Sequence, residues 1–283
     1  MKFFPFYLIT ILAACLRLMA QPAVSYKWTK TEIQADTLLN RQQVYDALKL
    51  YNMVIRMQEK EKFKGQSGVR FKRALCYYYL TEFNKAISDL NIFIEQNPEN
   101  LRAKLMRAYV YRELDRGEEQ LSDINAVLQA DPYNTDLLKW RAGLLLEMNR
   151  AEEALNALQN LQQFYNDEEV ELNLGLAYYY LEQPDEALEH FNRAIFINGG
   201  YFPAYRYAAL LCMEQEAYPH ALEYIELALR LVPDDLNLIL SKGISLLETG
   251  NPDTGCSFIN KAFYAGMEEA AYYLEHYCYS VDD

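Results

Sequence analysis

The sequence of 283 residues is poor in the residue types that build tight turns, metal sites and nucleic-acid contacts. It has 11 glycines, 9 prolines and 3 histidines, and its 27 Lys and Arg residues are outnumbered by 40 Asp and Glu residues. The scarcity of Gly and Pro argues against an all-β fold, which needs many tight turns. The net charge of −13 argues against a nucleic-acid partner, because phosphate contacts require clustered basic side chains. A hydrophobic fraction of 51% is typical of a globular protein and argues against disorder.

Motifs that carry chemistry are also missing. The sequence contains no glycine-rich phosphate loop, no Cys-x-x-Cys or His-Glu-x-x-His metal motif, and no Gly-x-Ser-x-Gly nucleophile motif. The three histidines, His190, His220 and His276, fall far apart in separate predicted helices. We therefore predict a protein that is not an enzyme and that uses no metal or other cofactor.

The N-terminal segment, residues 1–20, is predicted to be a secretory signal. Lys2 precedes an apolar stretch that is too short and too interrupted for a spanning helix. Cleavage after Ala20 would leave Gln21 at the N-terminus. Two alternatives stay open: residues 12–15 resemble a lipobox, which would give a membrane tether through a lipidated Cys15, or the segment remains as an uncleaved anchor. All three place the rest of the chain outside the cytoplasm, and the cleaved and lipidated forms place it in the periplasm or at the outer membrane.

A pattern of small and large residues recurs with a period of about 34 residues. Aligned on this period, the chain divides into seven repeats: 28–66, 67–100, 101–134, 135–167, 168–201, 202–235 and 236–269. The eighth position is Ala or Gly in every repeat, the twentieth is small in six of the seven, and the twenty-fourth is always large and apolar. Two antiparallel helices per repeat explain this pattern, because small residues let the helices approach and the large residue fills the space beside them. One repeat cannot bury its apolar face alone, so the repeats are predicted to stack.

This pattern closely resembles the tetratricopeptide repeat family over residues 28–269. The second repeat is among the clearest, with Ala74, Tyr77, Ala86, Leu90 and Pro98 at family positions. The resemblance implies an all-α, right-handed solenoid of about seven helix-turn-helix repeats. The first repeat departs from the family by carrying about five extra residues, and the last repeat lacks the closing proline.

The segments that flank the repeats have separate predicted roles. Residues 21–27 form a short linker, and residues 281–283 form a tail. Residues 270–280 are rich in tyrosine and apolar residues, and we predict that they form a single helix. This helix would cap the exposed end of the stack, which a solenoid needs.

The resemblance also implies a binding surface, because in this family the first helix of each repeat lines a concave groove. Helical geometry puts positions 2, 6, 9 and 13 of a repeat on the face opposite the packed one. The predicted groove residues are mostly apolar or aromatic: Leu75, Tyr79, Met106, Tyr109, Trp140, Asn173, Leu176, Tyr180, Tyr207, Leu210 and Ile244. Aromatic side chains of this kind bury much area on binding at little entropic cost. The alternative is that these residues pack against neighbouring first helices.

Two cysteines are predicted to lie near each other at the C-terminal end. Cys256 falls in the second helix of the last repeat, and Cys278 falls in the capping helix that should pack on it. Export makes a disulfide between them chemically feasible, and it would tie the cap to the stack. The alternative is two buried thiols. Cys76 and Cys212 belong to distant repeats and are not expected to pair.

Charge is distributed unevenly along the chain. Residues 21–110 hold 15 basic and 9 acidic residues, whereas residues 111–283 hold 10 basic and 31 acidic residues. This asymmetry either steers a partner or reflects a solvated basic stretch around the lengthened first repeat.

The family resemblance, together with the absence of catalytic motifs, implies a non-catalytic scaffold or adaptor of the cell envelope that binds a protein or peptide in its groove. A periplasmic, chaperone-like holdase for envelope or secreted clients is the alternative, since a fold does not fix a function. The partner and the oligomeric state stay open.

Overall fold

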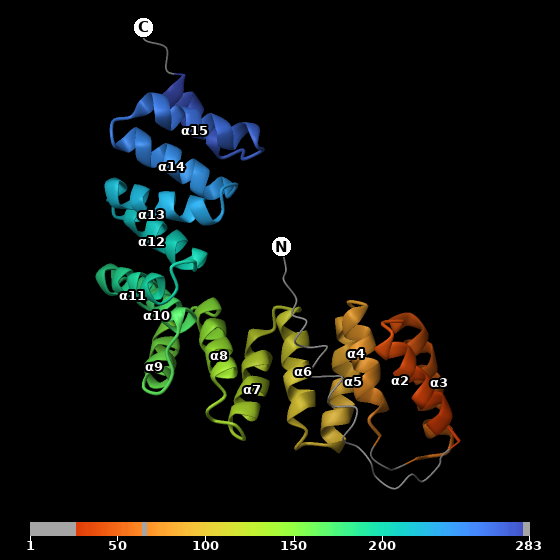
Figure 1. The fold of residues 1–283 in the computed structure, drawn as a ribbon. Helices are drawn as coiled ribbons and strands as arrows, with labels where there is room; N and C mark the ends of the chain where they lie inside the picture. Colours follow the sequence, from red (N-terminus) through yellow and green to blue (C-terminus); the bar gives the residue numbers. More distant parts are fainter. Residues whose placement is uncertain (1–26, 64–66, 280–283) are drawn as a thin grey trace. The chain divides into compact units, whose positions relative to one another are not determined.

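The structure, a computed structural model, describes residues 27–63 and 67–279, and within these ranges the chain is helical and contains no strand (Figure 1). The predicted all-α solenoid of helical hairpins is confirmed. None of the helices in these two ranges is both long enough and apolar enough to cross a membrane. The predicted signal segment, including Cys15 and the cleavage site after Ala20, lies outside the described residues, as do the tail at 281–283 and all but the last residue of the linker. The chain forms two compact parts, which we call the N-terminal lobe, up to Pro132, and the C-terminal lobe, from Tyr133.

The N-terminal lobe consists of three helical hairpins. They are formed by α2 (Thr29–Asn40) with α3 (Val44–Lys60), α4 (Val69–Tyr79) with α5 (Phe83–Gln96), and α6 (Leu101–Arg112) with α7 (Gly117–Leu128). Within the lobe each hairpin packs on the next. Helix α3 has 17 residues and α5 has 14, so part of the extra length of the first repeat is additional helix.

The C-terminal lobe continues the same plan with four hairpins. They are formed by α8 (Thr135–Glu147) with α9 (Ala151–Gln162), α10 (Glu168–Tyr180) with α11 (Pro184–Ile197), α12 (Phe202–Glu214) with α13 (Tyr218–Leu231), and α14 (Leu236–Glu248) with α15 (Pro252–Tyr264). These hairpins stack in chain order (Figure 1). Their interior is filled by fully buried large side chains such as Leu158, Phe191, Ile225 and Ile259.

The C-terminal cap differs from the single helix predicted for residues 270–280. It consists of one turn of α-helix, α16 (Ala270–Tyr273), followed by a π-helix, η1 (Leu274–Cys278). The N–H of Tyr279 donates to the carbonyl of Leu274, five residues earlier, at 2.9 Å, and this longer hydrogen-bonded step widens the helical turn. Ala270 and Leu274 are buried against Ile259 and Ala262 of α15, so the segment does cover the end of the apolar core.

Small residues permit the closest approaches between paired helices. A Cβ atom added to Gly175 of α10 would lie 2.5 Å from the ring of Phe191 in α11. A Cβ atom on Gly243 of α14 would lie 2.6 Å from the Cγ1 atom of Ile259 in α15. Phe191 and Ile259 are the large residues at the twenty-fourth repeat position, so the small and large positions meet as the sequence pattern predicts.

Every hairpin turns at a residue in the left-handed backbone region. The fifteenth position of each repeat has this conformation: Gln42, Thr81, Asp115, Asn149, Glu182, Glu216 and Gly250. At Thr81, whose φ is 58°, the N–H of Glu82 donates to the carbonyl of Tyr77 at 2.8 Å and the N–H of Thr81 donates to that of Tyr78 at 3.0 Å. These two bonds form a Schellman motif, which ends the first helix and reverses the chain.

Candidate interaction surfaces

The four predicted groove residues of the N-terminal lobe divide into two buried and two accessible side chains. Leu75 is 3% exposed and Met106 is 6% exposed, and both belong to the core formed by α4, α5 and α6. The prediction that these two residues line an open groove is wrong, because neighbouring helices cover them. Tyr79 is exposed, and Tyr109 is partly exposed with the guanidinium of Arg112 5.3 Å from its ring centre.

The C-terminal lobe keeps all seven of its predicted groove residues at least partly accessible. Tyr180 of α10 is 50% exposed and Leu210 of α12 is 43% exposed. The other five are partly exposed: Trp140 on α8, Asn173 and Leu176 on α10, Tyr207 on α12 and Ile244 on α14. The ring of Tyr207 stacks on buried Phe191 with centroids 5.9 Å apart, which fixes one aromatic side chain of this face. We call these seven residues the first-helix face.

Carboxylates end three of the four first helices of this lobe. Glu147, Glu214 and Glu248 are the last residues of α8, α12 and α14, and all three are exposed. None of them forms an ion pair with another described residue. The hydroxyl of Tyr179 donates to Glu214 at 2.7 Å, and this bond helps to raise the pKa of Tyr179 to about 12. A carboxylate at this end of a helix is disfavoured, because the helix dipole is negative there.

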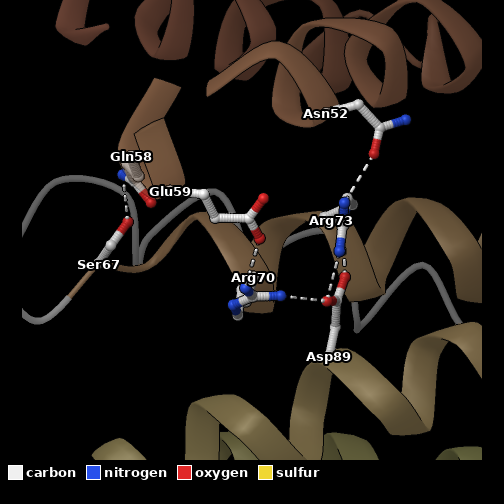
Figure 2. Close-up of polar contacts among 7 residues, drawn as sticks. All are labelled: Asn52, Gln58, Glu59, Ser67, Arg70, Arg73 and Asp89. Atoms are coloured by element: carbon white, nitrogen blue, oxygen red, sulfur yellow. Dashed lines mark hydrogen bonds and ion pairs between the residues drawn. The ribbon is translucent and has the colours of Figure 1, made fainter. Parts of the chain in front are cut away.

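Two basic residues of the second repeat, Arg70 and Arg73, are engaged in a polar cluster (Figure 2). Arg73 of α4 holds Asp89 of α5 through two hydrogen bonds, Nε to Oδ2 at 2.6 Å and Nη2 to Oδ1 at 2.7 Å, and donates to Asn52 of α3 at 2.7 Å. Arg70 pairs with Asp89 at 3.2 Å and with Glu59 of α3 at 3.3 Å. The cluster therefore joins three consecutive helices.

Lys72 is engaged in the same way on another side of α4. Its ammonium group lies 2.9 Å from Glu32 and 2.8 Å from Asp36, both on α2. Burial lowers the pKa of Lys72, but the charges and hydrogen bonds of Asp36 and Glu32 outweigh it, and the net effect raises that pKa. Arg70, Lys72 and Arg73 thus stabilise packing inside the N-terminal lobe.

His190 forms a buried pair with a carboxylate. Its Nδ1 atom lies 2.6 Å from an Oε2 atom of Glu171, and its ring stacks on Tyr178 with centroids 5.2 Å apart. The other oxygen of Glu171 accepts hydrogen bonds from Gln162 at 2.9 Å and Asn166 at 2.6 Å. Burial raises the pKa of Glu171, but the bonds from His190 and Asn166 outweigh it and leave that pKa lowered. The network links α9, α10 and α11, so His190 stabilises the packing of these helices.

The cysteines are arranged in one pair and two separate thiols. Cys256 of α15 and Cys278 of η1 are joined by a disulfide, with their Cα atoms 5.6 Å apart. Cys76 and Cys212 are free and buried in different lobes. Within residues 27–63 and 67–279, no cluster of three or more His, Cys, Asp or Glu side chains is arranged to hold a metal ion.

Comparisons with known proteins agree with this architecture. Profiles described as tetratricopeptide repeat match residues 71–135 and 169–201. No curated protein matches the sequence. A tetratricopeptide repeat protein from Parabacteroides merdae superposes with a TM-score of 0.65 at 17% identity, over 88% of this chain and 97% of that one.

Two further solved structures are similar at low sequence identity. The C-terminal part of a TPR repeat-containing protein from Cytophaga hutchinsonii gives a TM-score of 0.67 at 15% identity, over 85% of this chain and 98% of that one. YrrB, described as a TPR protein with an unusual peptide-binding site, superposes with a TM-score of 0.51 at 16% identity. The match covers 66% of this chain and 97% of that one. The profile matches identify tetratricopeptide repeats in both lobes, and the recurring hairpins with close contacts at their small residues have the fold of the similar solved structures.

Proposed function

We propose that this protein is a non-catalytic interaction scaffold that binds a peptide or protein segment on the first-helix face of its C-terminal lobe. The observation that carries the proposal is a row at one repeat position, the thirteenth. It presents Glu147, Tyr180, Glu214 and Glu248 from α8, α10, α12 and α14 in turn. Leu210 adds an exposed apolar side chain on the same helices. A face of this kind offers apolar anchors bordered by negative charge.

The charge of this row indicates the chemistry of the ligand. Each terminal carboxylate costs its helix about 0.3–1 kcal/mol, because it lies at the negative end of the dipole. Three such residues on one face are unfavourable for the free protein, and a bound cation would offset them. The ligand proposed is therefore a segment in which Lys or Arg residues stand beside apolar residues.

The protein is proposed to act in the periplasm or at the outer membrane. This location rests on the character of residues 1–20, with either release after Ala20 or lipid anchoring at Cys15. Mass analysis of exported protein distinguishes the two, because only the second leaves an acylated cysteine at the N-terminus. A chain recovered from the cytoplasm with this segment intact would contradict both.

Affinity capture from envelope fractions tests the first-helix face. The double variant Tyr180→Ala/Leu210→Ala removes its two most exposed apolar side chains, and Ile33→Ala/Tyr45→Ala is a matched control on exposed residues of the N-terminal lobe. We expect partners to be lost from the first variant only, with circular dichroism unchanged in both. Partners retained equally by all three proteins would move binding away from this face.

A triple variant, Glu147→Gln/Glu214→Gln/Glu248→Gln, tests the role of the carboxylates. We expect it to be more stable than the wild type and to capture less partner, because the substitution removes both the dipole conflict and the attraction for cations. A loss of stability together with unchanged capture would show that the carboxylates serve the fold alone.

The second candidate, a holdase, is favoured by the large exposed aromatic side chains of the C-terminal lobe, among them Tyr180 and Phe196. A holdase suppresses the aggregation of unrelated unfolded proteins at stoichiometric amounts. A scaffold captures a saturable partner and leaves such aggregation unchanged, so light scattering of two unrelated clients separates the candidates.

A further inference from the structure

A second apolar surface lies at the C-terminal ends of the second helices of the C-terminal lobe. Phe196, at the end of α11, is 91% exposed, and Tyr264, at the end of α15, is 82% exposed. The same repeat positions, twenty-nine to thirty-one, carry exposed apolar side chains in all four repeats of the lobe. We call this set the junction edge: Phe164, Phe196, Ile197, Leu231, Val232 and Tyr264.

These residues form a row because of the way the repeats are built. The four hairpins of the lobe stack in chain order, so equivalent positions of successive repeats follow one another along the stack. At one end the row is extended by Tyr133, which is exposed and lies with its ring centroid 5.5 Å from that of Phe164. The junction edge is distinct from the first-helix face, which is made by α8, α10, α12 and α14.

The fold does not require apolar residues at this edge. In the N-terminal lobe the equivalent positions are Glu95 and Gln96 in the second repeat, and Gln129 and Ala130 in the third. All four are exposed. Because one lobe of the same chain builds this edge from mainly polar residues, the apolar residues of the other lobe do not serve the packing of the repeat. Exposed apolar side chains that recur at one edge of successive repeats are typical of an interaction surface.

The charge near the edge selects the occupant. Exposed carboxylates stand in two of the loops that follow it, at Asp234, Glu268 and Glu269, and they outnumber the one cation at the positions of the edge, Arg230. Residues 111–283 hold 31 acidic against 10 basic residues. An anionic lipid surface would be repelled by this charge. We propose that the junction edge docks a cationic amphipathic segment of a partner protein, with apolar residues on the edge and Lys or Arg residues against the carboxylates.

A labelled peptide makes the proposal testable. The probe is an amphipathic helix of Leu and Lys, about five turns long, compared with one of Leu and Glu and one of Ser and Lys. Every protein in the measurement carries Tyr180→Ala/Leu210→Ala and Glu147→Gln/Glu214→Gln/Glu248→Gln, so that the most exposed apolar anchors and the carboxylates of the first-helix side are absent throughout. Fluorescence anisotropy is expected to show saturable binding of the Leu and Lys peptide only. Adding Phe196→Ser/Tyr264→Ser is expected to weaken that binding at least about tenfold, because two aromatic anchors are lost without any change in charge.

Several results would overturn the proposal. Equal affinity with and without Phe196→Ser/Tyr264→Ser would mean that the peptide binds by charge alone. No binding of the Leu and Lys peptide would exclude this occupant, as would equal binding of the Ser and Lys peptide. Dimerisation that Phe196→Ser/Tyr264→Ser abolishes would assign the edge to a second copy, and anionic vesicle binding that it abolishes would assign the edge to lipid. None of these results bears on capture by the first-helix face, which is measured with the edge intact.

Discussion

Arg107 of α6 holds Asp123 of α7 by two hydrogen bonds of 2.8 Å, and this geometry repeats the pair of Arg73 and Asp89 one repeat earlier. In both repeats the guanidinium also donates to an asparagine of the preceding second helix, at 2.7 Å. Both aspartates are buried, so each pair joins three helices through charge-assisted hydrogen bonds. In both pairs the carboxylate follows the arginine by 16 positions in the sequence.

The fourth repeat has the arginine of this arrangement but not the carboxylate. Arg141 occupies the seventh position, whereas the twenty-third is Ala157. The Nε atom of Arg141 is buried without a hydrogen-bond partner in the part of the chain that the structure describes, and burial lowers the pKa of this guanidinium. We predict that Ala157→Asp stabilises the protein by about 1 kcal/mol, the gain of a charge-assisted bond less the lower helix propensity of Asp.

Chemical denaturation measures this gain, and two controls locate it. Ala157→Asn offers the same shape without the charge and should give a smaller effect. In an Arg141→Gln background, Ala157→Asp should give no gain, because the double-mutant cycle removes the pair. A gain that persists in that background would show that the aspartate acts elsewhere.

Two glycines with different surroundings give opposite predictions. A Cβ atom on Gly243 would lie 2.6 Å from Ile259 and 2.9 Å from the carbonyl oxygen of Gly255, so Gly243→Ala should cost about 1–3 kcal/mol by overpacking. A Cβ atom on Gly143 would meet nothing within 4 Å. Gly143→Ala should therefore stabilise α8 by about 0.5–1 kcal/mol, the helix-propensity difference between the two residues. Thermal unfolding of both variants checks the pair, and equal shifts would contradict the contact argument.

The sequence predicts the helical hairpins well because the sizes of the residues at recurring positions determine how the paired helices pack. Small residues such as Gly175 and Gly243 oppose large ones such as Phe191 and Ile259, and the structure brings these residues into contact. The turns are less predictable. Gly250, Asn149 and Asp115 have residue types that the left-handed conformation favours, whereas Thr81 is β-branched and adopts the same conformation. Stacking of the hairpins stabilises this turn even at residues such as Thr81, whose local backbone preference is for another conformation.

The candidate binding surfaces are predicted less completely, because the sequence pattern does not show which residues neighbouring helices cover. A helical wheel identifies the face to which Leu75 and Met106 belong, but it does not show that neighbouring helices cover them. Tyr180 and Leu210 lie on the equivalent face and remain exposed. The arginine–aspartate pairs can be recognised in the sequence, because the same spacing of 16 residues occurs in two successive repeats. The pattern of small and large residues does not include these positions. The junction edge can be recognised in the same way, because apolar residues recur in the sequence just before the loops between repeats.

The buried carboxylate of Glu171 predicts a dependence of stability on pH. Its pKa is lowered from the ordinary value of 4.5 in the folded state. The folded protein therefore binds this proton more weakly than the unfolded chain does, and the resulting stability is present above the unfolded pKa and is lost as pH falls through the lower folded value. Glu171→Gln should lower stability at neutral pH and should reduce the slope of the stability curve on the acid side of that ordinary pKa. Equal slopes for the two proteins in denaturant titrations between about pH 5 and 2 would contradict the contribution of Glu171.

The disulfide between Cys256 and Cys278 is expected to stabilise the C-terminal end of the chain. Cys256 and Cys278 are separated by 22 residues, and closing a loop of that size contributes about 3 kcal/mol by restricting the unfolded chain. Cys278→Ser should therefore lower the unfolding midpoint, and a reductant should lower that of the wild type by the same amount while leaving the variant unchanged. The first element to open should be the cap, because α16 and η1 lie at the end of the stack and pack mainly against α15. Hydrogen exchange at Leu274 reports that opening directly. Peptide mapping under non-reducing conditions provides the independent check, and recovery of both thiols free from exported protein would show that the bridge does not form.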